Sequence, residues 1–337
     1  MSTSLRRGGF GLLLALALSL LVLGGAPAFA QAQPNAEPNA DQVRRQQTQP
    51  LNNAPVWRDV RSGESHFTTV RGPETGVLIQ SEGDTWRRLR NGPVTRYGGV
   101  LLLVVPLALA LFFLVKGAMK LHARPTGRAL RRFSPFERVV HWGTAISFVV
   151  LAFTGLAILF AKHLIAPLFG PAVLGPLLVV GKNLHNYVGP VFLVFTVVMI
   201  FAFARDNVWH SSDRLWIRKA GGLFTGEHVP SGRFNFGEKT WFWIGVTFLG
   251  LIVAASGLVM DFPNFGQVRS TMQWANIIHA VAAILLMALS LGHIYLGTIG
   301  MEGAFQSMKT GYVDETWAKE HHELWYEDAK AGKAVGR

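Results

Sequence analysis

Four histidines stand inside or at the edges of long uncharged stretches: His141, His185, His279 and His293. An imidazole can bind a metal ion, carry a proton or donate a hydrogen bond, and its charge changes near neutral pH. Two of the four, His279 and His293, share one stretch and stand fourteen positions apart. The elements that carry these rings decide which of the three roles applies.

Residues 270–301 carry both of these histidines and no fully charged side chain. A helix of about 20 residues crosses a hydrocarbon core of about 30 Å, so this stretch is long enough to span a membrane. At about 100° and 1.5 Å per residue, fourteen residues bring the two rings to nearly the same face, about 21 Å apart along the axis. Each ring would therefore lie near one surface of the membrane, where ionisable groups are functional candidates.

The composition agrees with a membrane protein. Of the 337 residues, 50% are hydrophobic and only 15% are charged, which predicts several transmembrane helices. The absence of cysteine excludes disulfides, thiolate catalysis, cysteine-held iron–sulfur clusters and c-type haem attachment. The net charge of +12 indicates basic cytoplasmic loops rather than nucleic-acid binding, since no basic helix or aromatic-interleaved repeat accompanies it.

Five uncharged stretches predict transmembrane helices, at residues 97–115, 139–161, 183–204, 240–260 and 270–301. A further apolar stretch, residues 163–181, contains Pro167, Pro171 and Pro176 as well as glycines. These helix breakers predict a loop or surface-lying segment rather than another lipid-exposed helix.

The charges of the loops predict the orientation. Segments 116–138 and 205–239 are rich in Lys and Arg, whereas the alternate loops carry only Lys162, Lys182 and Arg269. This asymmetry places the basic segments and the C-terminus in the cytoplasm and the N-terminus outside. Residues 1–30 agree, because a pair of arginines, an apolar run and the sequence Ala-Phe-Ala before residue 31 are typical of a cleaved signal peptide.

Residues 31–96 then form an exported extension. Gln, Asn, Pro and Ala dominate it through residue 53, which predicts disorder. The patches HFTTV and GVLIQ within residues 56–94 predict a small β-rich or extended element.

Depth sorts the four histidines into two pairs, His185 with His279 near the outer face and His141 with His293 near the inner face. Two b-type haems require one neutral imidazole on either side of each porphyrin. Zinc fits less well, because two histidines without a paired carboxylate or thiol leave its coordination incomplete. Histidines that only hydrogen-bond neighbouring helices, or that relay protons in a transporter, are the other interpretations. Small residues beside the ligands are expected to let the porphyrin approach the backbone, among them Gly143, Gly189, Ala280, Ala282, Ala283 and Gly292.

The motifs RVVHWG, NLHNYVG, GRFNFGEK, IIHAVA and LGHIY occur in this order and are followed by WAKEHHELWY. In this combination the chain resembles, over about residues 131–328, the gamma subunit of membrane-bound formate dehydrogenase, the di-haem cytochrome b556. RxxHW alone also suits the cytochrome b subunit of a hydrogenase or another respiratory reductase, which is the alternative.

The resemblance implies an all-α membrane protein, a four-helix transmembrane haem-binding bundle at residues 131–301. An extra N-terminal transmembrane helix at 97–116 and a cytoplasmic C-terminal tail at 302–337 complete the expected chain. Two haem b groups are implied, the outer held by His185 and His279 and the inner by His141 and His293. Menaquinone or ubiquinone would bind beside the inner haem against His293 and the loop residues Asn235 and Gly237, although that loop could also be a solvated turn.

The implied function is electron transfer in anaerobic respiration, in the bacterial inner membrane. Electrons would pass from an iron–sulfur beta subunit through the two haems to quinone near the cytoplasm. Formate would be oxidised by a catalytic alpha subunit, so no catalytic residue is expected on this chain. The periplasmic extension 31–96 is expected to be a docking surface for these exported partner subunits.

Overall fold

The computed structural model describes residues 44, 54–63, 81–222 and 225–333. The chain divides into two compact units, residues 1–62 and 63–337. In the first unit the described residues form helix α3 (Ala54–Ser62). The expected signal peptide and the patches HFTTV and GVLIQ lie outside the described residues.

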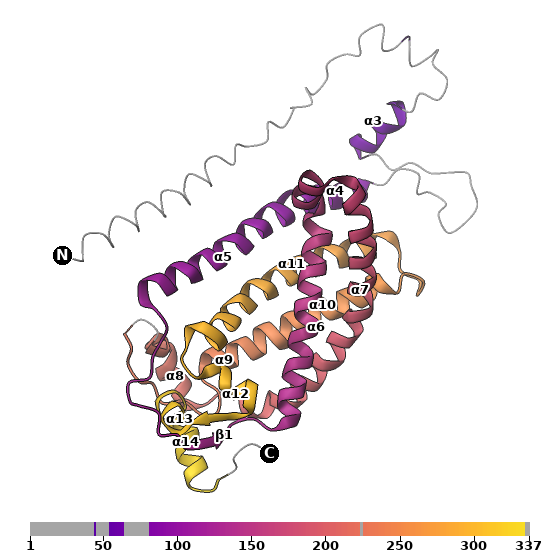
Figure 1. Cartoon of the computed structure of the whole chain (residues 1–337). Coiled ribbons are helices and arrows are strands. Elements are labelled where there is room, and N and C mark those ends of the chain that lie inside the picture. Colours follow the sequence, from indigo (N-terminus) through magenta and orange to yellow (C-terminus); the bar gives the residue numbers. More distant parts are fainter. Residues whose placement is uncertain (1–43, 45–53, 64–80, 223–224, 334–337) are drawn as a thin grey trace, which may run out of the picture. The chain divides into compact units, whose positions relative to one another are not determined.

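Among the described residues of the second unit, five helices are long and apolar enough to cross a membrane, as predicted. Their axes are α5 (Thr95–Lys116), α6 (Pro135–Phe160), α7 (Ala166–Phe203), α10 (Gly250–Asp261) and α11 (Arg269–Tyr295). Helix α6 packs along α7, and α11 packs between α10 and α5 (Figure 1). Shorter helical turns extend several of these axes: η2 (Ala161–Ile165), α9 (Phe236–Thr240), η5 (Trp241–Leu249) and η6 (Leu296–Gly300).

The first of these axes begins earlier than the sequence predicted. Helix α4 (Ser81–Leu89) and the π-turn η1 (Arg90–Val94) run into α5, so residues 81–94 are helical rather than β-rich. Within α4, Asp84 forms ion pairs with Arg87 and Arg88, three and four residues later, spacings that stabilise a helix. The indole Nε1 of Trp86 also donates a hydrogen bond to Asn276 Oδ1 of α11 at 3.1 Å.

Helix α6 begins at a capping box. Ser134 Oγ accepts from the backbone N–H of Glu137, and the Glu137 carboxylate accepts from the backbone N–H of Ser134 at 2.7 Å. Pro135 occupies the first helical position, where its missing N–H costs nothing. Helix α6 therefore begins at residue 135, four residues before the predicted start of the second span.

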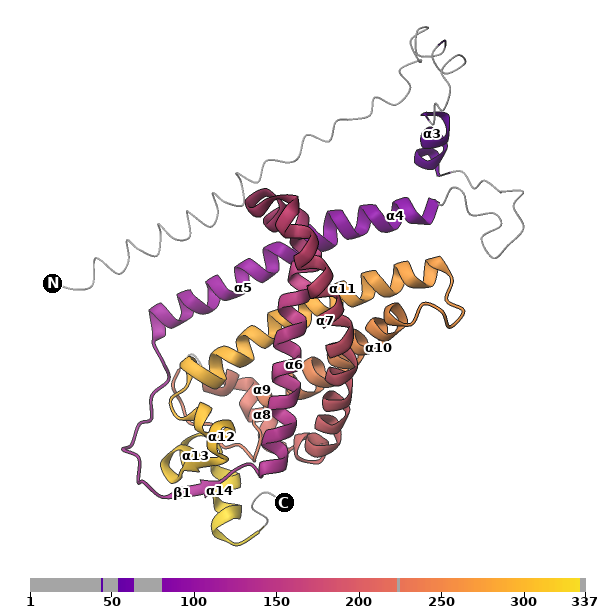
Figure 2. The same ribbon diagram turned by 45° about the vertical axis from the view of Figure 1, so that its right-hand side comes forward.

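The prediction of a loop or surface segment at residues 163–181 is wrong, because these residues are helical. Helix α7 covers most of them and is interrupted at Gly170, whose backbone has φ 73° and ψ 174°. Pro167 stands in the first turn of α7 and Pro171 directly follows the interruption at Gly170, positions that tolerate a proline. The segment adds no separate span: α6 and α7 form one helical hairpin (Figure 2).

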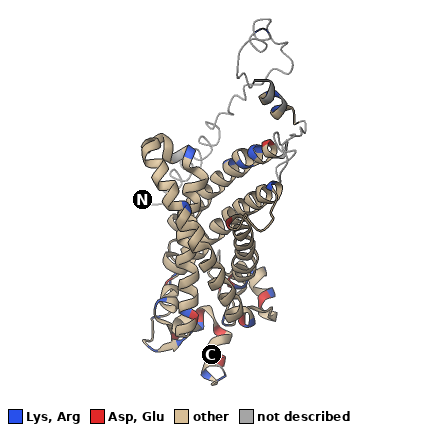
Figure 3. Cartoon of the chain, turned by 90° about the vertical axis from the view of Figure 1, so that its right-hand side faces the viewer, with Lys and Arg blue, Asp and Glu red and all other residues tan. Residues whose placement is uncertain are grey.

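The segments that the sequence placed in the cytoplasm fold together at one end of the bundle. We call this part the cap: residues 117–134, 205–222, 225–235 and 301–333. Strand β1 (Ala129–Arg131) pairs antiparallel with β2 (Tyr312–Asp314) and so joins the first of these segments to the last. Charged residues concentrate in the cap and at the opposite end of the helices (Figure 3). The remaining cap elements are η3 (Ala204–Asn207), α8 (Ser211–Arg218), η4 (Ala220–Gly222), α12 (Ala304–Thr310), α13 (Glu315–His321) and α14 (Glu323–Lys330).

A small apolar core holds the C-terminal part of the cap. Trp317 and Ala318 of α13 pack against Val313 of β2 and against Trp325 and Tyr326 of α14, and all five are buried. Burying a large apolar side chain stabilises a fold by about 1.5–3 kcal/mol. The expected tail, residues 302–337, is therefore folded onto the bundle through residue 333.

Candidate functional site

The structure brings the four histidines together as two pairs. The ring centroids of His185 and His279 are 6.0 Å apart, and those of His141 and His293 are 6.2 Å apart. His141 and His185 belong to α6 and α7, while His279 and His293 both belong to α11. Helix α11 thus contributes one ring to each pair, and the pairs lie at two depths of the bundle.

These distances fit two imidazoles on opposite sides of one metal ion. A ligating imidazole nitrogen lies about 2.0–2.1 Å from a first-row metal such as zinc, and the ring centroid lies roughly 1 Å further out, so two opposed rings have centroids about 6 Å apart. Among the described residues, no group of three or more His, Cys, Asp or Glu side chains gathers to hold a bare metal ion. The geometry therefore suits a group that needs only two axial protein ligands, as haem iron does.

Hydrogen bonds orient both rings of the outer pair. His279 Nδ1 donates to the carbonyl oxygen of Val253 on α10 at 2.9 Å, with Ser256 Oγ nearby at 3.2 Å. His185 Nδ1 contacts Thr154 Oγ1 of α6 at 2.7 Å. Because the Thr154 hydroxyl donates to Val150 O, the imidazole is the donor in that contact. Both rings then keep the Nε2 lone pair for a metal, the tautomer that such a second contact selects.

The inner pair is held differently. The His293 ring stacks on the indole of Trp241, with centroids 5.0 Å apart and planes 14° apart. His141 Nδ1 is buried and has no hydrogen-bond partner among the described residues. The neighbouring Trp142 anchors this end of α6 by donating from Nε1 to Met308 O of the cap at 3.1 Å. Packing rather than hydrogen bonding therefore positions the inner rings.

Glycines leave space around the outer pair. A Cβ atom added at Gly155 would lie 3.3 Å from Cε1 of His185, and one at Gly257 would lie 3.3 Å from Cε1 of His279. The sequence analysis missed both positions, although each lies one residue beyond the residue that hydrogen-bonds the ring. Of the glycines it named, Gly292 faces open space, whereas Gly143 is filled by the ring of Phe195.

A cavity of about 1420 Å³ extends from the inner pair to the cap. His141, His293 and Trp241 line its inner part. Pockets for drug-sized ligands occupy about 300–1,000 Å³, so this cavity has room for a large prosthetic group and a second ligand beside it. Asn235 and Gly237 also line it, so the structure places all three residues of the predicted quinone site at one cavity.

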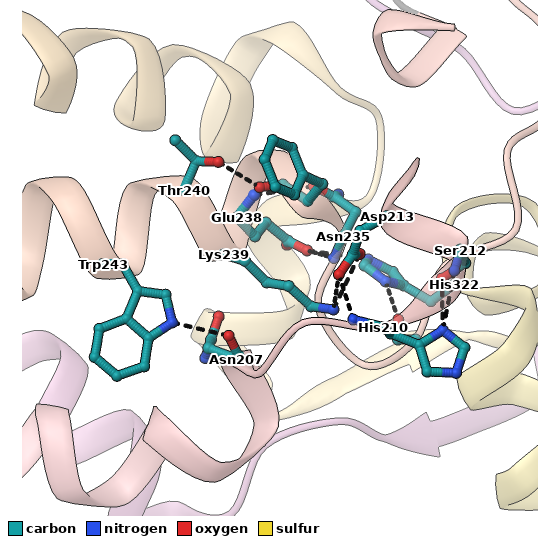
Figure 4. Close-up of polar contacts among 12 residues, drawn as sticks. Asn207, His210, Ser212, Asp213, Asn235, Glu238, Lys239, Thr240, Trp243 and His322 are labelled. Carbon is teal, nitrogen blue, oxygen red and sulfur yellow. Dashed lines mark hydrogen bonds and ion pairs between the residues drawn. The ribbon is translucent and has the colours of Figure 1, made fainter. Parts of the chain in front are cut away.

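The side chain of Asn235 is already part of a capping box. Its Oδ1 accepts from the Glu238 backbone N–H at 3.0 Å, and Glu238 Oε2 accepts from the Asn235 backbone N–H at 2.9 Å (Figure 4). The side-chain NH2 group of Asn235 is not used by this cap and remains available as a donor. A Cβ atom at Gly237 would meet the indole of Trp216 at 2.9 Å, so close packing of the cap explains this glycine.

A buried cluster of charged groups borders the same cavity, and the sequence analysis did not find it. The Arg132 guanidinium donates to Glu238 Oε1, to Arg233 O and to His322 Nε2, each at 2.9–3.0 Å. His322 Nδ1 donates to Gly232 O at 2.8 Å. Burial lowers the pKa of His322 to about 3, and the charge of Arg132 acts in the same direction. The adjacent histidines of the motif WAKEHHELWY were the only available signal, because the partners lie about a hundred or more residues away.

Two further ion pairs fix the base of the bundle. Arg233 contacts both carboxylate oxygens of Glu137 at 2.7 and 2.9 Å and also binds Asp206. Lys239 Nζ binds the Asp213 carboxylate at 2.8 Å, and both side chains are buried (Figure 4). Burial of such charges requires pairing, so these contacts hold the cap segments in one arrangement around the cavity mouth.

Long apolar helices that hold two pairs of histidines are typical of membrane cytochromes b. The chain belongs to the prokaryotic cytochrome b561 family, whose model matches residues 132–311. It is an integral membrane protein, and membership of a cytochrome b family implies haem b.

The chain is also similar to individual subunits of formate dehydrogenases. The chain is 30% identical over 203 residues to the cytochrome b556(fdo) subunit of formate dehydrogenase from Escherichia coli K12, covering 59% of this chain and 92% of that relative. It is 26% identical to the nitrate-inducible formate dehydrogenase cytochrome b556 subunit of the same organism, covering 59% of this chain and 90% of the relative. The cytochrome b556 subunit of formate dehydrogenase from Haemophilus influenzae is 26% identical, with 61% and 85% covered. The resemblance predicted from the motifs is confirmed.

Proposed function

We propose that the chain is the membrane cytochrome b subunit of a respiratory formate dehydrogenase and carries two b-type haems. The observation that supports this most directly is the pair of histidine couples, with centroid distances of 6.0 and 6.2 Å. His185 and His279 would hold the outer group, and His141 and His293 the inner one. Haem iron with two imidazole ligands supplies one-electron transfer.

The residues around each pair set how the groups would be bound. Val253 and Thr154 hold the outer rings in the tautomer that leaves Nε2 unprotonated. Trp241 holds the ring of His293 at the inner site. Each of the helices α6, α7, α10 and α11 would therefore contribute either a ligand or a group that orients one.

The direction of electron flow follows from the proposed orientation, with the cap in the cytoplasm. Electrons would enter at the His185/His279 end from an iron–sulfur partner outside, and leave at the His141/His293 end to a quinone in the cavity. His293, Asn235 and Gly237 would border that quinone. The chain itself would bind no formate, and formate oxidation would belong to a separate catalytic subunit.

Haem content and donor preference test this proposal. We expect purified protein to show b-type bands in the reduced-minus-oxidised spectrum and two haems per chain. His279→Ala should remove one haem and abolish formate-driven quinone reduction, whereas His210→Ala in the cap should change neither. One haem or none in the unsubstituted protein contradicts the proposal, and quinone reduction driven by hydrogen but not by formate would favour a hydrogenase subunit.

The N-terminal extension is proposed to be a docking surface for the exported partners. Its last part, α4, is held against α11 through Trp86 and Asn276, which would place any bound partner near the outer pair. Deletion of residues 31–80 should prevent assembly with the partner subunits while both haems remain. Unchanged assembly on a native gel would contradict this role.

A further inference from the structure

Ionisable side chains line the cavity from the cap surface to its inner end. At the surface stand His228 and Glu323, whose side chains are 39% and 37% exposed. His321 lies further in. Glu238 belongs to α9 and is hydrogen-bonded to Asn235, the residue that precedes this helix. The electron-transfer function proposed above uses none of these four groups.

Both ring nitrogens of His228 make hydrogen bonds at the cap surface. Its Nδ1 contacts the backbone carbonyl oxygen of Glu320 at 2.7 Å, and its Nε2 contacts a carboxylate oxygen of Glu323 at 2.9 Å. Both partners are acceptors, so only the ring with a proton on each nitrogen satisfies both contacts. His228 and Glu323 thus form a hydrogen-bonded pair that is open to solvent.

His321 continues the series inward. Its ring packs on Trp317 with centroids 5.1 Å apart, and its Nε2 is buried without a hydrogen-bond partner among the described residues. Burial lowers the pKa of His321 to about 4; the charges of Glu320 and Glu238 oppose this, whereas those of Arg132 and His228 add to it. The ring is therefore neutral at pH 7, and a neutral imidazole can accept a proton at one nitrogen and release one from the other.

Glu238 is the innermost carboxylate of the series. Its side chain is 34% exposed and lines the cavity, so the exposed part faces the interior space. Arg132 Nη2 and the Asn235 backbone N–H each hold one carboxylate oxygen, and His322 Nε2 lies 3.8 Å away. Both nitrogens of His322 are already used, by Arg132 and by Gly232 O, so His322 is a positioning residue rather than a carrier.

The inference rests on the proposed function, because reduction of a quinone to a hydroquinone consumes two electrons and two protons. The electrons come from the iron–sulfur partner, and each proton forms an O–H bond at a quinone oxygen. We propose that His321 and Glu238 deliver these protons, which enter from the cytoplasm at His228 and Glu323. Arg132 holds the Glu238 carboxylate at the cavity while it accepts and releases the proton, and His322 accepts a hydrogen bond from Arg132 and so orients the guanidinium.

The test uses membranes that contain the chain with its partner subunits, with a reduced viologen dye as donor and a soluble quinone as acceptor. We expect Glu238→Gln and His321→Ala to lower kcat for quinone reduction by about tenfold or more, the low end of what a proton-transfer group contributes. The KM for quinone should stay unchanged, and added imidazole should restore much of the rate of His321→Ala. Glu327→Gln and His210→Ala are matched controls, since Glu327 is exposed and neither residue lines the cavity.

Two measurements separate a proton path from a structural defect. Haem content and haem reduction by the dye should be normal in both variants. In purified protein, exchange of the His321 C2 hydrogen with D2O should have its pH midpoint moved downward by Glu238→Gln, because Glu238 favours the charged ring. Full quinone reduction in both variants, or loss without imidazole rescue, overturns the inference. Absence of haem or quinone reduction in the unsubstituted protein would instead overturn the proposed function.

Discussion

The imidazole of His293 lies flat against the indole of Trp241, with centroids 5.0 Å apart and an interplanar angle of 14°. In the described part of the chain no comparable stack holds the outer rings, whose Nδ1 atoms contact Thr154 and Val253. An aromatic pair contributes about 0.5–1.5 kcal/mol beyond the area it buries. The stack with Trp241 therefore helps to orient the ring of His293.

We expect Trp241→Leu to weaken binding of the inner haem by about two- to tenfold, the equivalent of the stacking energy. The outer haem should be unaffected, because none of its ring contacts involves Trp241. Haem titration of the apoprotein and electron paramagnetic resonance of the oxidised protein measure the two sites separately. Trp241→Phe, which keeps an aromatic face, should bind nearly normally; an equal loss in both variants would contradict the role of stacking.

Gly155→Val and Gly257→Val should each displace one outer ligand. A Cβ atom at either position already lies 3.3 Å from a histidine Cε1, and overpacking of this kind costs about 1–3 kcal/mol. Each variant should therefore lose the outer haem while it keeps the inner one. Gly181→Val, where nothing lies within 4 Å of an added Cβ, should keep both, and loss of haem in this control would show a general folding defect.

Arg233→Met should destabilise the junction between cap and bundle. It leaves the buried carboxylate of Glu137 without the cation that contacts both its oxygens. Breaking a buried ion pair from one side costs about 3–5 kcal/mol, whereas replacing both partners by apolar residues costs much less. Thermal unfolding in detergent should show this loss, and the double variant Arg233→Met with Glu137→Met should recover part of it. By contrast, Lys219→Met, which breaks the exposed pair with Glu227, should cost less than about 1 kcal/mol.

The two adjacent histidines of the tail should make the cap sensitive to acid. Burial lowers the pKa of His321 to about 4 and that of His322 to about 3, from an ordinary value of 6.5. Between these values the unfolded chain binds more protons than the folded one, so the free energy of unfolding rises with pH. The free energy of unfolding is therefore highest above about pH 6.5 and falls as the pH drops toward 4 and below, where burying these rings requires that they stay neutral.

Limited proteolysis of the cap as a function of pH checks this expectation. A variant with both His321→Gln and His322→Gln should lose the dependence between pH 6.5 and 4. Carboxylates affect the stability at lower pH. Burial raises the pKa of Asp314, for example, but hydrogen bonds from backbone N–H groups hold it below its ordinary value. Equal acid sensitivity of the double variant and the unsubstituted protein would exclude the histidines as its cause.

The pairing of the histidines could be predicted because membrane thickness and helix rise fix the depth of each residue. His185 and His279 are 94 positions apart in sequence, yet an equal distance from one membrane surface leaves them few other neighbours. Orientation was read from loop charges in the same way. The structure has the basic segments gathered in one cap, as that interpretation requires.

The prolines of residues 163–181 misled the prediction because their count was considered without their positions. Pro167 and Pro171 follow breaks in the helix, and the left-handed backbone at Gly170 provides one of those breaks. A helix can restart at a proline, since the first turn has no internal partner for its N–H groups. Only Pro176 and Pro190 stand deeper in the helix.

The cluster of Arg132, Glu238 and His322 was beyond sequence reasoning for a different reason. Arg132 and His322 come from two cap segments separated by 190 positions, and Glu238 comes from α9. No periodicity relates them, and each alone resembles an ordinary loop charge. Only the folding of these loops against one another creates the buried polar lining of the cavity.

Helix α11 carries one histidine of each pair, fourteen positions apart and with no break between them. The number of residues between the two histidines therefore fixes the direction in which one side chain projects relative to the other. Substitutions between the two histidines change only local packing, but the insertion or deletion of one residue would turn His293 by about 100° relative to His279. The separation of the two histidine pairs is thus a property of backbone geometry, and this stretch of the chain can vary in residue type but not in number.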